Sequence, residues 1–212
     1  MAALTPTNPT RDDGALEWAW AGRALDVVSG DLHVVAPFPD GVLVALIDGL
    51  GHGDGAATAA EAAMQALREH ADEPVLRLVG HCHEAMRKTR GAVLSLASFD
   101  LVASSMTWVG VGNVEGILLR AHERDRDGLA DATLLLRGGI VGSRLPPLRA
   151  DTILVRGGDL LVMTTDGIRP GYADEIDREA MPSTIAASIV EGHARADDDA
   201  CVLVARFRGR GA

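Results

Sequence analysis

The chain has 212 residues and a formal net charge of −10, with 20 basic against 30 acidic residues. Its length fits one domain with a sizeable core, and an apolar content of 47% excludes an intrinsically disordered chain. The acidic balance argues against a nucleic-acid partner, because no basic stripe is available to displace counterions from phosphates. The sequence has no apolar run of about 18 residues and no signal-peptide core. We therefore expect no membrane partner and a cytoplasmic protein.

The predicted elements form runs of strands separated by helices. Residues 1–14 predict a flexible tail and residues 15–212 a single domain. Apolar runs and alternation predict strands at 16–21, 24–36 (with a break near Gly30), 41–47, 92–99, 101–112, 114–121, 132–139 and 200–207, and a hairpin over 152–167 that turns at Gly157 and Gly158. Helical periodicity predicts helices at 56–71, from Pro74 to about Met86, and at 183–195 with Ser183 as its cap. The polar segment 122–131 predicts a solvated loop.

This order of elements predicts an α+β protein, because strands follow one another directly while the helices are grouped near 55–90 and 180–195. Two mostly antiparallel sheets packed face to face, with the helices outside, would bury the apolar faces of all elements. Cys82 and Cys201 give neither a disulfide framework nor zinc-ligand spacing, and we expect both to be buried thiols.

The most informative stretch is LVALIDGLGHGDGAATAA, residues 43–60, in which an apolar run ends at Asp48 and glycines then alternate. One interpretation is a dinucleotide-binding loop, since Gly51, Gly53 and Ala56 fit the pattern G-x-G-x-x-A. That interpretation is weak because a second helix, not a parallel strand, is predicted to follow, and because it gives Asp48 no role.

A metal site explains Asp48 better, because other acids stand at comparable places. Asp166 also ends an apolar run and precedes a glycine, Asp198 begins the last strand, and Asp31 lies at the break of the second strand. Ends and starts of neighbouring antiparallel strands meet at one sheet edge. Crowded carboxylates stay ionised only when cations neutralise them, and hard oxygen ligands suit Mg²⁺ or Mn²⁺. The small Gly49 would let its carbonyl oxygen approach the same ions.

These residues resemble a known family, the PPM-type (type 2C clan) metal-dependent serine/threonine phosphatases, in the SpoIIE-like branch. Within that branch the short chain is most similar to the stand-alone phosphatases of the stressosome. The motifs that carry the resemblance are VSGD (28–31), DGLGHG (48–53), VGVGNVEG (109–116), RGGIVG (137–142), MTTDGI (163–168) and DDACVLV (198–204).

The resemblance implies an αββα sandwich and a site for two Mn²⁺ or Mg²⁺ ions. It implies that Asp48 bridges both ions and that the Gly49 carbonyl binds one of them. Asp166 and Asp198 would hold the other ion, with Asp31 helping directly or through water. Two further residues match family positions near the ions: Asp199, a polar residue behind the ligands, and Asn113.

The sequence also departs from the family pattern near the site. An arginine that grips the substrate phosphate in broader family members is replaced by Asp26, and a histidine proposed as their general acid is replaced by Leu50. His52 is then a candidate to protonate the leaving oxygen, or a residue that only holds the loop. His81 and His83 do not share a helix face, which favours a solvated helix surface over a metal site.

The predicted activity is removal of phosphate from phosphoserine or phosphothreonine by a water molecule that bridges the two ions. The expected partner is a phosphorylated regulatory protein, either a STAS-domain antagonist of an anti-sigma factor or a related stressosome component. The alternative is a non-catalytic regulator that uses a phosphatase fold to bind a phosphoprotein.

Overall fold

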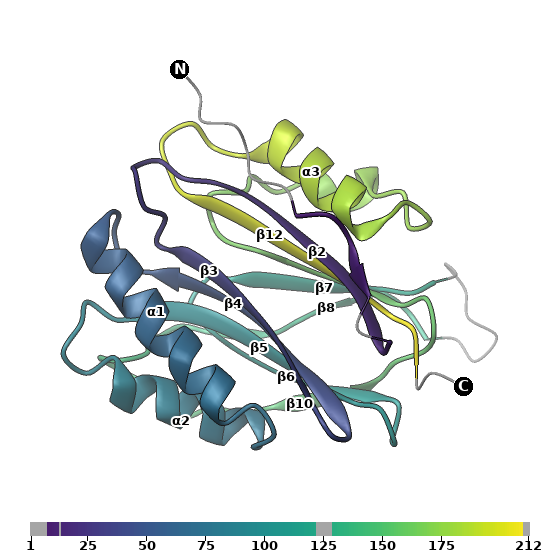
Figure 1. The fold of residues 1–212 in the computed structure, drawn as a ribbon, viewed down its shortest axis with the longest axis horizontal. Coiled ribbons are helices and arrows are strands. Elements are labelled where there is room, and N and C mark those ends of the chain that lie inside the picture. Colours follow the sequence, from purple (N-terminus) through teal and green to yellow (C-terminus); the bar gives the residue numbers. More distant parts are fainter. Residues whose placement is uncertain (1–7, 13, 122–128, 210–212) are drawn as a thin grey trace.

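The computed structural model describes residues 8–12, 14–121 and 129–209, and two sheets form its centre (Figure 1). Sheet A has the strand order β1-β2-β12-β11-β7-β8, and sheet B has the order β10-β6-β5-β4-β3, with β9 added parallel to β6. All other pairings are antiparallel. The strands of sheet A are β1 (Arg11–Asp12), β2 (Leu16–Arg23), β7 (Glu115–Leu119), β8 (Ala132–Thr133), β11 (Leu160–Thr164) and β12 (Ala200–Phe207). Those of sheet B are β3 (Asp31–Phe38), β4 (Gly41–Gly49), β5 (Ala92–Asp100), β6 (Ser105–Val111), β9 (Leu136–Arg137) and β10 (Asp151–Leu154).

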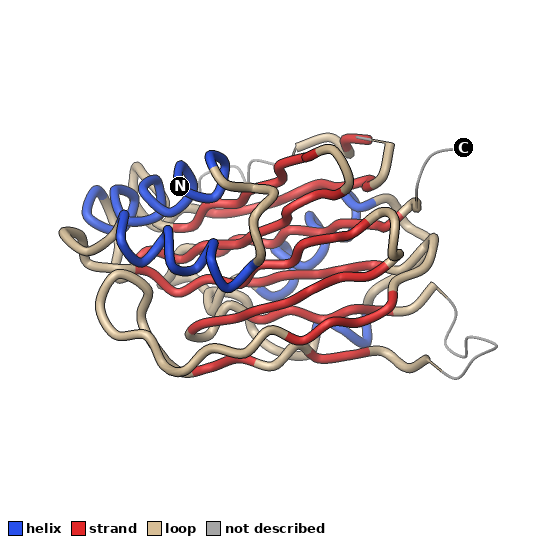
Figure 2. The backbone as a smooth tube through the Cα atoms, turned by 90° about the horizontal axis from the view of Figure 1, so that it is seen from below, coloured by secondary structure: helices blue, strands red, loops and turns tan. Residues whose placement is uncertain are grey.

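Helices cover the outer face of each sheet. α1 (Asp54–Glu69) and α2 (Val75–Ala85) lie over sheet B, and α3 (Pro182–His193) lies over β2 and β12 of sheet A (Figure 1). A 3₁₀ turn, η1 (Tyr172–Glu175), precedes α3. Seen from below, the helices of sheet B lie in front of the strands (Figure 2). The expected αββα sandwich is confirmed.

Strand β4 shows why the sandwich forms, since both of its faces are buried. Leu46 points between the sheets, where it packs in one core with Trp108 of β6 and Leu203 of β12. Its neighbours Leu43 and Ile47 point the other way, into a second core under α1 and α2. Successive side chains of a strand alternate between faces, so a strand with a layer on each side needs a continuous apolar run. A third core lies between sheet A and α3.

The predicted hairpin over 152–167 is wrong. β10 pairs with β6 in sheet B, whereas β11 lies between β12 and β7 in sheet A. Gly157 and Gly158 therefore carry the chain from one sheet to the other, and Gly158 has a φ of 95° that suits glycine. The strand predicted at 132–139 is divided in the same way, since β8 belongs to sheet A and β9 to sheet B.

Several local expectations also change. Ser183 does not cap α3: the helix begins at Pro182, whose ring suits the first helical position, and no side chain caps it. The strand predicted over 24–36 begins only at Asp31. Residues 11 and 12 of the expected tail form β1. Residues 1–7 lie outside the described residues, as does most of the predicted loop 122–131.

The pairing of β5 excludes the dinucleotide-binding interpretation. β5 runs antiparallel to β4, whereas a dinucleotide-binding loop belongs to a parallel βαβ unit.

Cys82 and Cys201 are both buried and free, as expected. Among the described residues, none of the helices has the length and apolar character needed to cross a bilayer.

Candidate metal centre

The acids predicted from the sequence lie at one end of the sandwich, where both sheets contribute. Asp31 begins β3 and Asp48 lies directly opposite it near the end of β4, both in sheet B. Asp166 follows β11 and Asp198 precedes β12, which are neighbours in sheet A. The sequence suggested a single sheet edge. The structure instead brings the acids together across the gap between two sheets.

A pocket of about 480 Å³ opens at this end of the molecule. Asp48, Asp166 and Asp198 all line it, as expected for residues that share one site. The other residues on its walls come from the loops around them: Leu25, Leu50, Gly51, His52, Val93, Gly112, Asn113, Gly138 and Asp197.

Asp31 lies deeper and is tied to the opposite sheet. Only 7% of it is exposed, and the Thr165 hydroxyl donates a 2.7 Å hydrogen bond to its Oδ2 atom. The same Thr165 oxygen accepts from the backbone N–H of Cys201 at 2.9 Å. Thr165 thus connects β3 with the ends of β11 and β12, and it holds the Asp31 carboxylate in one orientation.

Close packing explains why a glycine follows both Asp48 and Asp166. A Cβ on Gly49 would lie 2.1 Å from the carbonyl oxygen of Ala56, in the first turn of α1. A Cβ on Gly167 would lie 1.8 Å from the carbonyl oxygen of Asp199. These contacts are far below van der Waals distance, so only glycine lets α1 and the start of β12 approach the acids this closely.

Asp199 anchors the loop between β2 and β3. Its Oδ1 accepts from the backbone N–H of Leu25 and its Oδ2 from that of Gly30, both at 2.7 Å. The side chain is buried, and two charge-assisted hydrogen bonds to backbone N–H groups fix the loop strongly. Asp199 therefore shapes the wall of the pocket from behind.

Asn113 and His52 each contact an acid at the pocket. Asn113 donates from Nδ2 to Asp166 Oδ2 at 2.7 Å, which orients an otherwise exposed carboxylate. His52 Nδ1 lies 2.8 Å from Oδ2 of Asp26. An ionised carboxylate only accepts hydrogen bonds, so Nδ1 carries the proton in this contact. The second ring nitrogen, Nε2, is then the one available for other partners.

The electrostatics of the cluster indicate a missing counter-charge. Burial, followed by the charges of Asp166, Asp198 and Asp199, raises the pKa of Asp48 to about 7. Burial and the Asp48 charge raise the pKa of Asp31 well above its ordinary value. Burial and Asp166 also raise the pKa of Asp198. Carboxyl groups in this state give up protons readily only when cations lie beside them.

The donor set fits Mg²⁺ or Mn²⁺, since the pocket offers carboxylate, amide and backbone oxygens and no cysteine. Within the described part of the chain, no three carboxylate oxygens of the four acids lie within 4.8 Å of one another. The family resemblance of these motifs implies a pair of such ions. The residues that would hold them are Asp48, Asp166, Asp198, the Gly49 carbonyl and Asp31.

Sequence reasoning missed three contributors to this site. Thr165 stands in the TTDG motif beside Asp166, but nothing in the pattern shows that it reaches Asp31. Asp26 was noted only as a departure from the family pattern, and its pairing with His52 spans 26 residues. Arg90 packs its guanidinium against the glycine loop: a Cβ on Gly51 would lie 3.0 Å from its Nη1 atom.

Comparison with known proteins agrees with this geometry. Residues 39–208 match the model of the family described as Stage II sporulation protein E (SpoIIE). The chain belongs to the SpoIIE family. A relative, the phosphoserine phosphatase RsbX of Bacillus subtilis (strain 168), is 24% identical over 141 residues, which are 66% of this chain and 68% of RsbX.

Solved structures share the same fold over nearly the whole chain. One comes from work on the bacterial stressosome as a modular system adapted to control secondary messenger signalling. It is 30% identical, has a TM-score of 0.81, and the match covers 90% of this chain and 99% of that one. RsbX in complex with magnesium is 18% identical, with a TM-score of 0.80 and coverage of 96% and 100%. The assignment to the PPM-type phosphatases of the SpoIIE-like branch is confirmed, and with it the classification as a serine/threonine protein phosphatase.

Proposed function

We propose that this protein is a Mn²⁺- or Mg²⁺-dependent phosphatase that removes phosphate from phosphoserine or phosphothreonine of a folded regulatory protein. The observation that carries the proposal is the group of four acids at one end of the sandwich, because the raised pKa values of Asp31, Asp48 and Asp198 call for cations beside them. Membership of the SpoIIE family and the similarity to a phosphoserine phosphatase support the same reaction class. Magnesium in RsbX supports the choice of ion.

When bound, two such ions supply an acidified water molecule as the nucleophile and offset the negative charge of the phosphate. The chain's own residues position the rest of the reaction. Asp48 is placed between the sheets by β4, and Asn113 holds Asp166 in a fixed orientation. Asp26 holds the ring of His52 through Nδ1–H, so that a second proton, carried on Nε2, is the one to pass to the leaving serine or threonine oxygen, which leaves His52 neutral.

The substrate class follows from the shape of the pocket mouth. The loop between β2 and β3 lines the pocket with Leu25 and exposes Val27 and Val28 to solvent, Val27 fully. An open site rimmed by apolar side chains favours a phosphorylated surface element of another protein over a small metabolite. The stressosome relative and RsbX support a STAS-domain antagonist or a stressosome component as this partner. The cytoplasm is the compartment in which such a partner would be met.

The test compares one phosphorylated STAS-domain protein with a short phosphopeptide of the same site sequence. We expect turnover of both with Mn²⁺, none with chelator, and at least roughly tenfold higher kcat/KM for the folded protein, about 1.4 kcal/mol of binding away from the phosphate. Val27→Ser should reduce this preference and leave peptide turnover unchanged. Equal rates on both substrates would contradict docking. Binding of the phosphoprotein without phosphate release under any metal would instead support the non-catalytic regulator.

A further inference from the structure

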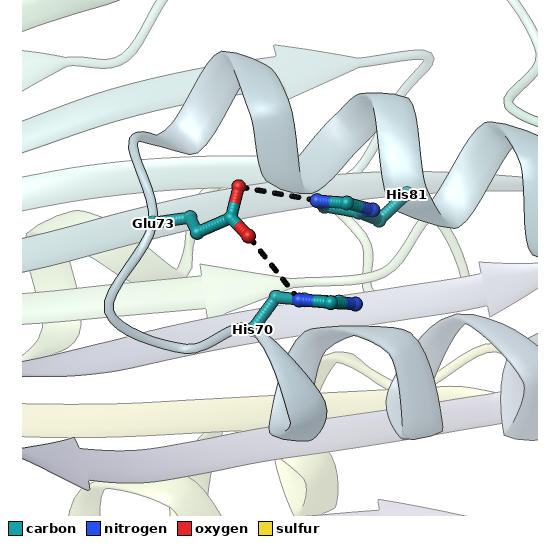
Figure 3. A group of neighbouring side chains, drawn as sticks. All are labelled: His70, Glu73 and His81. Carbon is teal, nitrogen blue, oxygen red and sulfur yellow. Dashed lines mark hydrogen bonds and ion pairs between the residues drawn. The ribbon is translucent and has the colours of Figure 1, made fainter.

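A second group of metal-type side chains lies where α1 turns into α2, at the opposite end of α1 from the acid pocket. His70 caps the C-terminal end of α1, Glu73 lies in the turn, and His81 comes from α2. Figure 3 shows both rings with a nitrogen edge turned toward the Glu73 carboxylate, which lies between them and the turn. We call these three residues the helix-turn cluster.

The contacts in the helix-turn cluster are short and convergent. His70 Nδ1 lies 3.2 Å from Glu73 Oε1, and His81 Nε2 lies 3.1 Å from Glu73 Oε2. The two rings stack with centroids 3.8 Å apart and planes within 10° of parallel. One ligand atom from each residue can be chosen so that all three lie within 4.8 Å of one another.

The arrangement offers one nitrogen from each ring and a carboxylate to a single ion. The two nitrogen–oxygen contacts reach different oxygens of Glu73, and because the rings are stacked, both must turn about their side-chain bonds before one nitrogen of each points at an ion. Two histidines and one carboxylate are also a known three-ligand set for zinc, with water in the fourth position. The side chains are 37%, 29% and 32% exposed for His70, Glu73 and His81, so water can reach the cluster.

Arg77 also contacts the carboxylate and competes with an ion for it. Its Nε lies 3.1 Å from Glu73 Oε2, but its side chain is 71% exposed and free to turn into solvent. The hydrogen bond from His81, with the nearby charges of His81, Arg77 and His70, keeps the pKa of Glu73 below its ordinary value. Glu73 is therefore an ionised ligand at neutral pH.

We propose that the helix-turn cluster is a binding site for a borderline transition-metal ion such as Zn²⁺, separate from the acid pocket and independent of the proposed phosphatase activity. The two sites differ in chemistry: imidazole nitrogens favour Zn²⁺, Ni²⁺ or Cu²⁺, whereas the carboxylates of the acid pocket favour Mg²⁺ or Mn²⁺. An ion here clips the end of α1 to α2. The other end of α1 packs on Gly49, so the clip stabilises the helix against which the acid pocket is built.

The experiment titrates Zn²⁺ into the full chain by calorimetry, with excess Mg²⁺ present to fill the acid pocket. Wild type should bind one Zn²⁺ that His81→Gln binds at least tenfold more weakly. A hundredfold excess of Zn²⁺ over its Kd should raise the Tm of wild type by about 5 °C or more, and that of His81→Gln by far less. Co²⁺ in the cluster should give the visible absorption of a four-coordinate nitrogen-containing site.

Matched variants separate this site from surface histidine–carboxylate pairs in general. His193 forms a similar pair with Glu175 at 3.1 Å, but the ring beside it belongs to Tyr172 and not to a histidine, so His193→Gln should bind Zn²⁺ like wild type. Arg77→Ala should bind it more tightly, because a competing cation is removed. His70→Gln is the second variant if His81→Gln does not fold without metal. Equal Zn²⁺ affinity and equal Tm shifts in wild type, His81→Gln and His70→Gln would overturn the proposal.

Discussion

Asp31 and Asp48 lie directly opposite each other in the β3–β4 ladder, with their side chains on the face that points between the two sheets. Like charges at such a position destabilise a sheet. Here the destabilisation is increased by burial, since Asp31 is almost completely enclosed. A structural role alone gives no reason for this pair, whereas a cation site gives a direct one.

The first prediction concerns the metal-free protein and its stability against pH. The pKa of Asp48 is about 7 in the folded state and near its ordinary 3.8 in the unfolded chain. The folded state therefore holds a proton that the unfolded chain releases, and stability falls as the pH rises toward 7. In chelator, the Tm of Asp48→Asn minus the Tm of wild type should therefore be about 5 °C larger at pH 8 than at pH 5.

Comparing the two proteins, and not wild type alone, removes the opposing contribution of His33. Burial, with the charges of Arg68 and Arg11, lowers the pKa of His33 to about 4, so this residue makes the fold more stable as the pH rises. The contribution is shared by both proteins. A Tm difference that does not change between pH 5 and pH 8 would show that Asp48 is not under like-charge strain.

The second prediction concerns activity. Asp48→Asn and Asp166→Asn should each lower kcat with Mn²⁺ by at least roughly a hundredfold, because each removes a charged ligand from a site that depends on charge. Circular dichroism should show an unchanged fold. Glu61→Gln, an exposed change on α1, is the control and should keep wild-type turnover. Full activity in either aspartate variant, or in EDTA, would rule out the metal mechanism.

Much of this site could be predicted from the sequence, because the residues that end a buried strand are adjacent to it in the chain. Asp48 and Asp166 each end an apolar run and precede a glycine, and the last strand spans 200–207 as predicted. An acidic residue at the end of an apolar run differs from the buried residues around it, so it stands out in the sequence. The acids could therefore be grouped as one candidate site before their positions were known. The layers were also readable, since they depend on which faces are apolar.

Pairing partners were not accessible in the same way. The segments at 151–154 and 160–164 are both apolar and are joined through two glycines, which is also the signal of a hairpin. Tertiary contacts decide that 151–154 pairs in sheet B and that 160–164 pairs in sheet A. The contact of His52 with Asp26 and that of His81 with Glu73 cross loops between elements, where no period of 2 or 3.6 residues applies. His81 lies partly exposed on the surface of α2, as expected, but its contact with Glu73 was not predicted.

The third prediction tests the contact between Asp26 and His52. His52→Ala should reduce turnover of a phosphoserine peptide far more than turnover of nitrophenyl phosphate, because a serine alkoxide needs a proton and an acidic phenol hardly does. Asp26→Asn should show the same bias in weaker form, since it leaves His52 in place but less well oriented. Equal losses on both substrates would assign the pair to loop structure alone.

The last prediction concerns the grip on the substrate phosphate. The family's phosphate-binding arginine is replaced here by Asp26, and the acids at the pocket repel a phosphate dianion until cations are bound. Arg90 begins the approach to β5, and its guanidinium lies against the glycine loop: a Cβ on Gly55 would be 2.8 Å from its Cζ atom. Only glycines leave room for a guanidinium at this place.

Arg90→Ala should therefore raise KM for phosphorylated substrates about tenfold and weaken inhibition by inorganic phosphate to a similar degree, with a smaller change in kcat. Arg90→Lys should restore part of the loss, since lysine keeps the charge but not the two-pronged geometry. Arg87 is the matched control, because it is an exposed arginine three residues away that pairs with Glu84 at 3.4 Å. If Arg90→Ala and Arg87→Ala share one KM and one phosphate inhibition constant with wild type, the phosphate is held by the metal ions and not by this arginine.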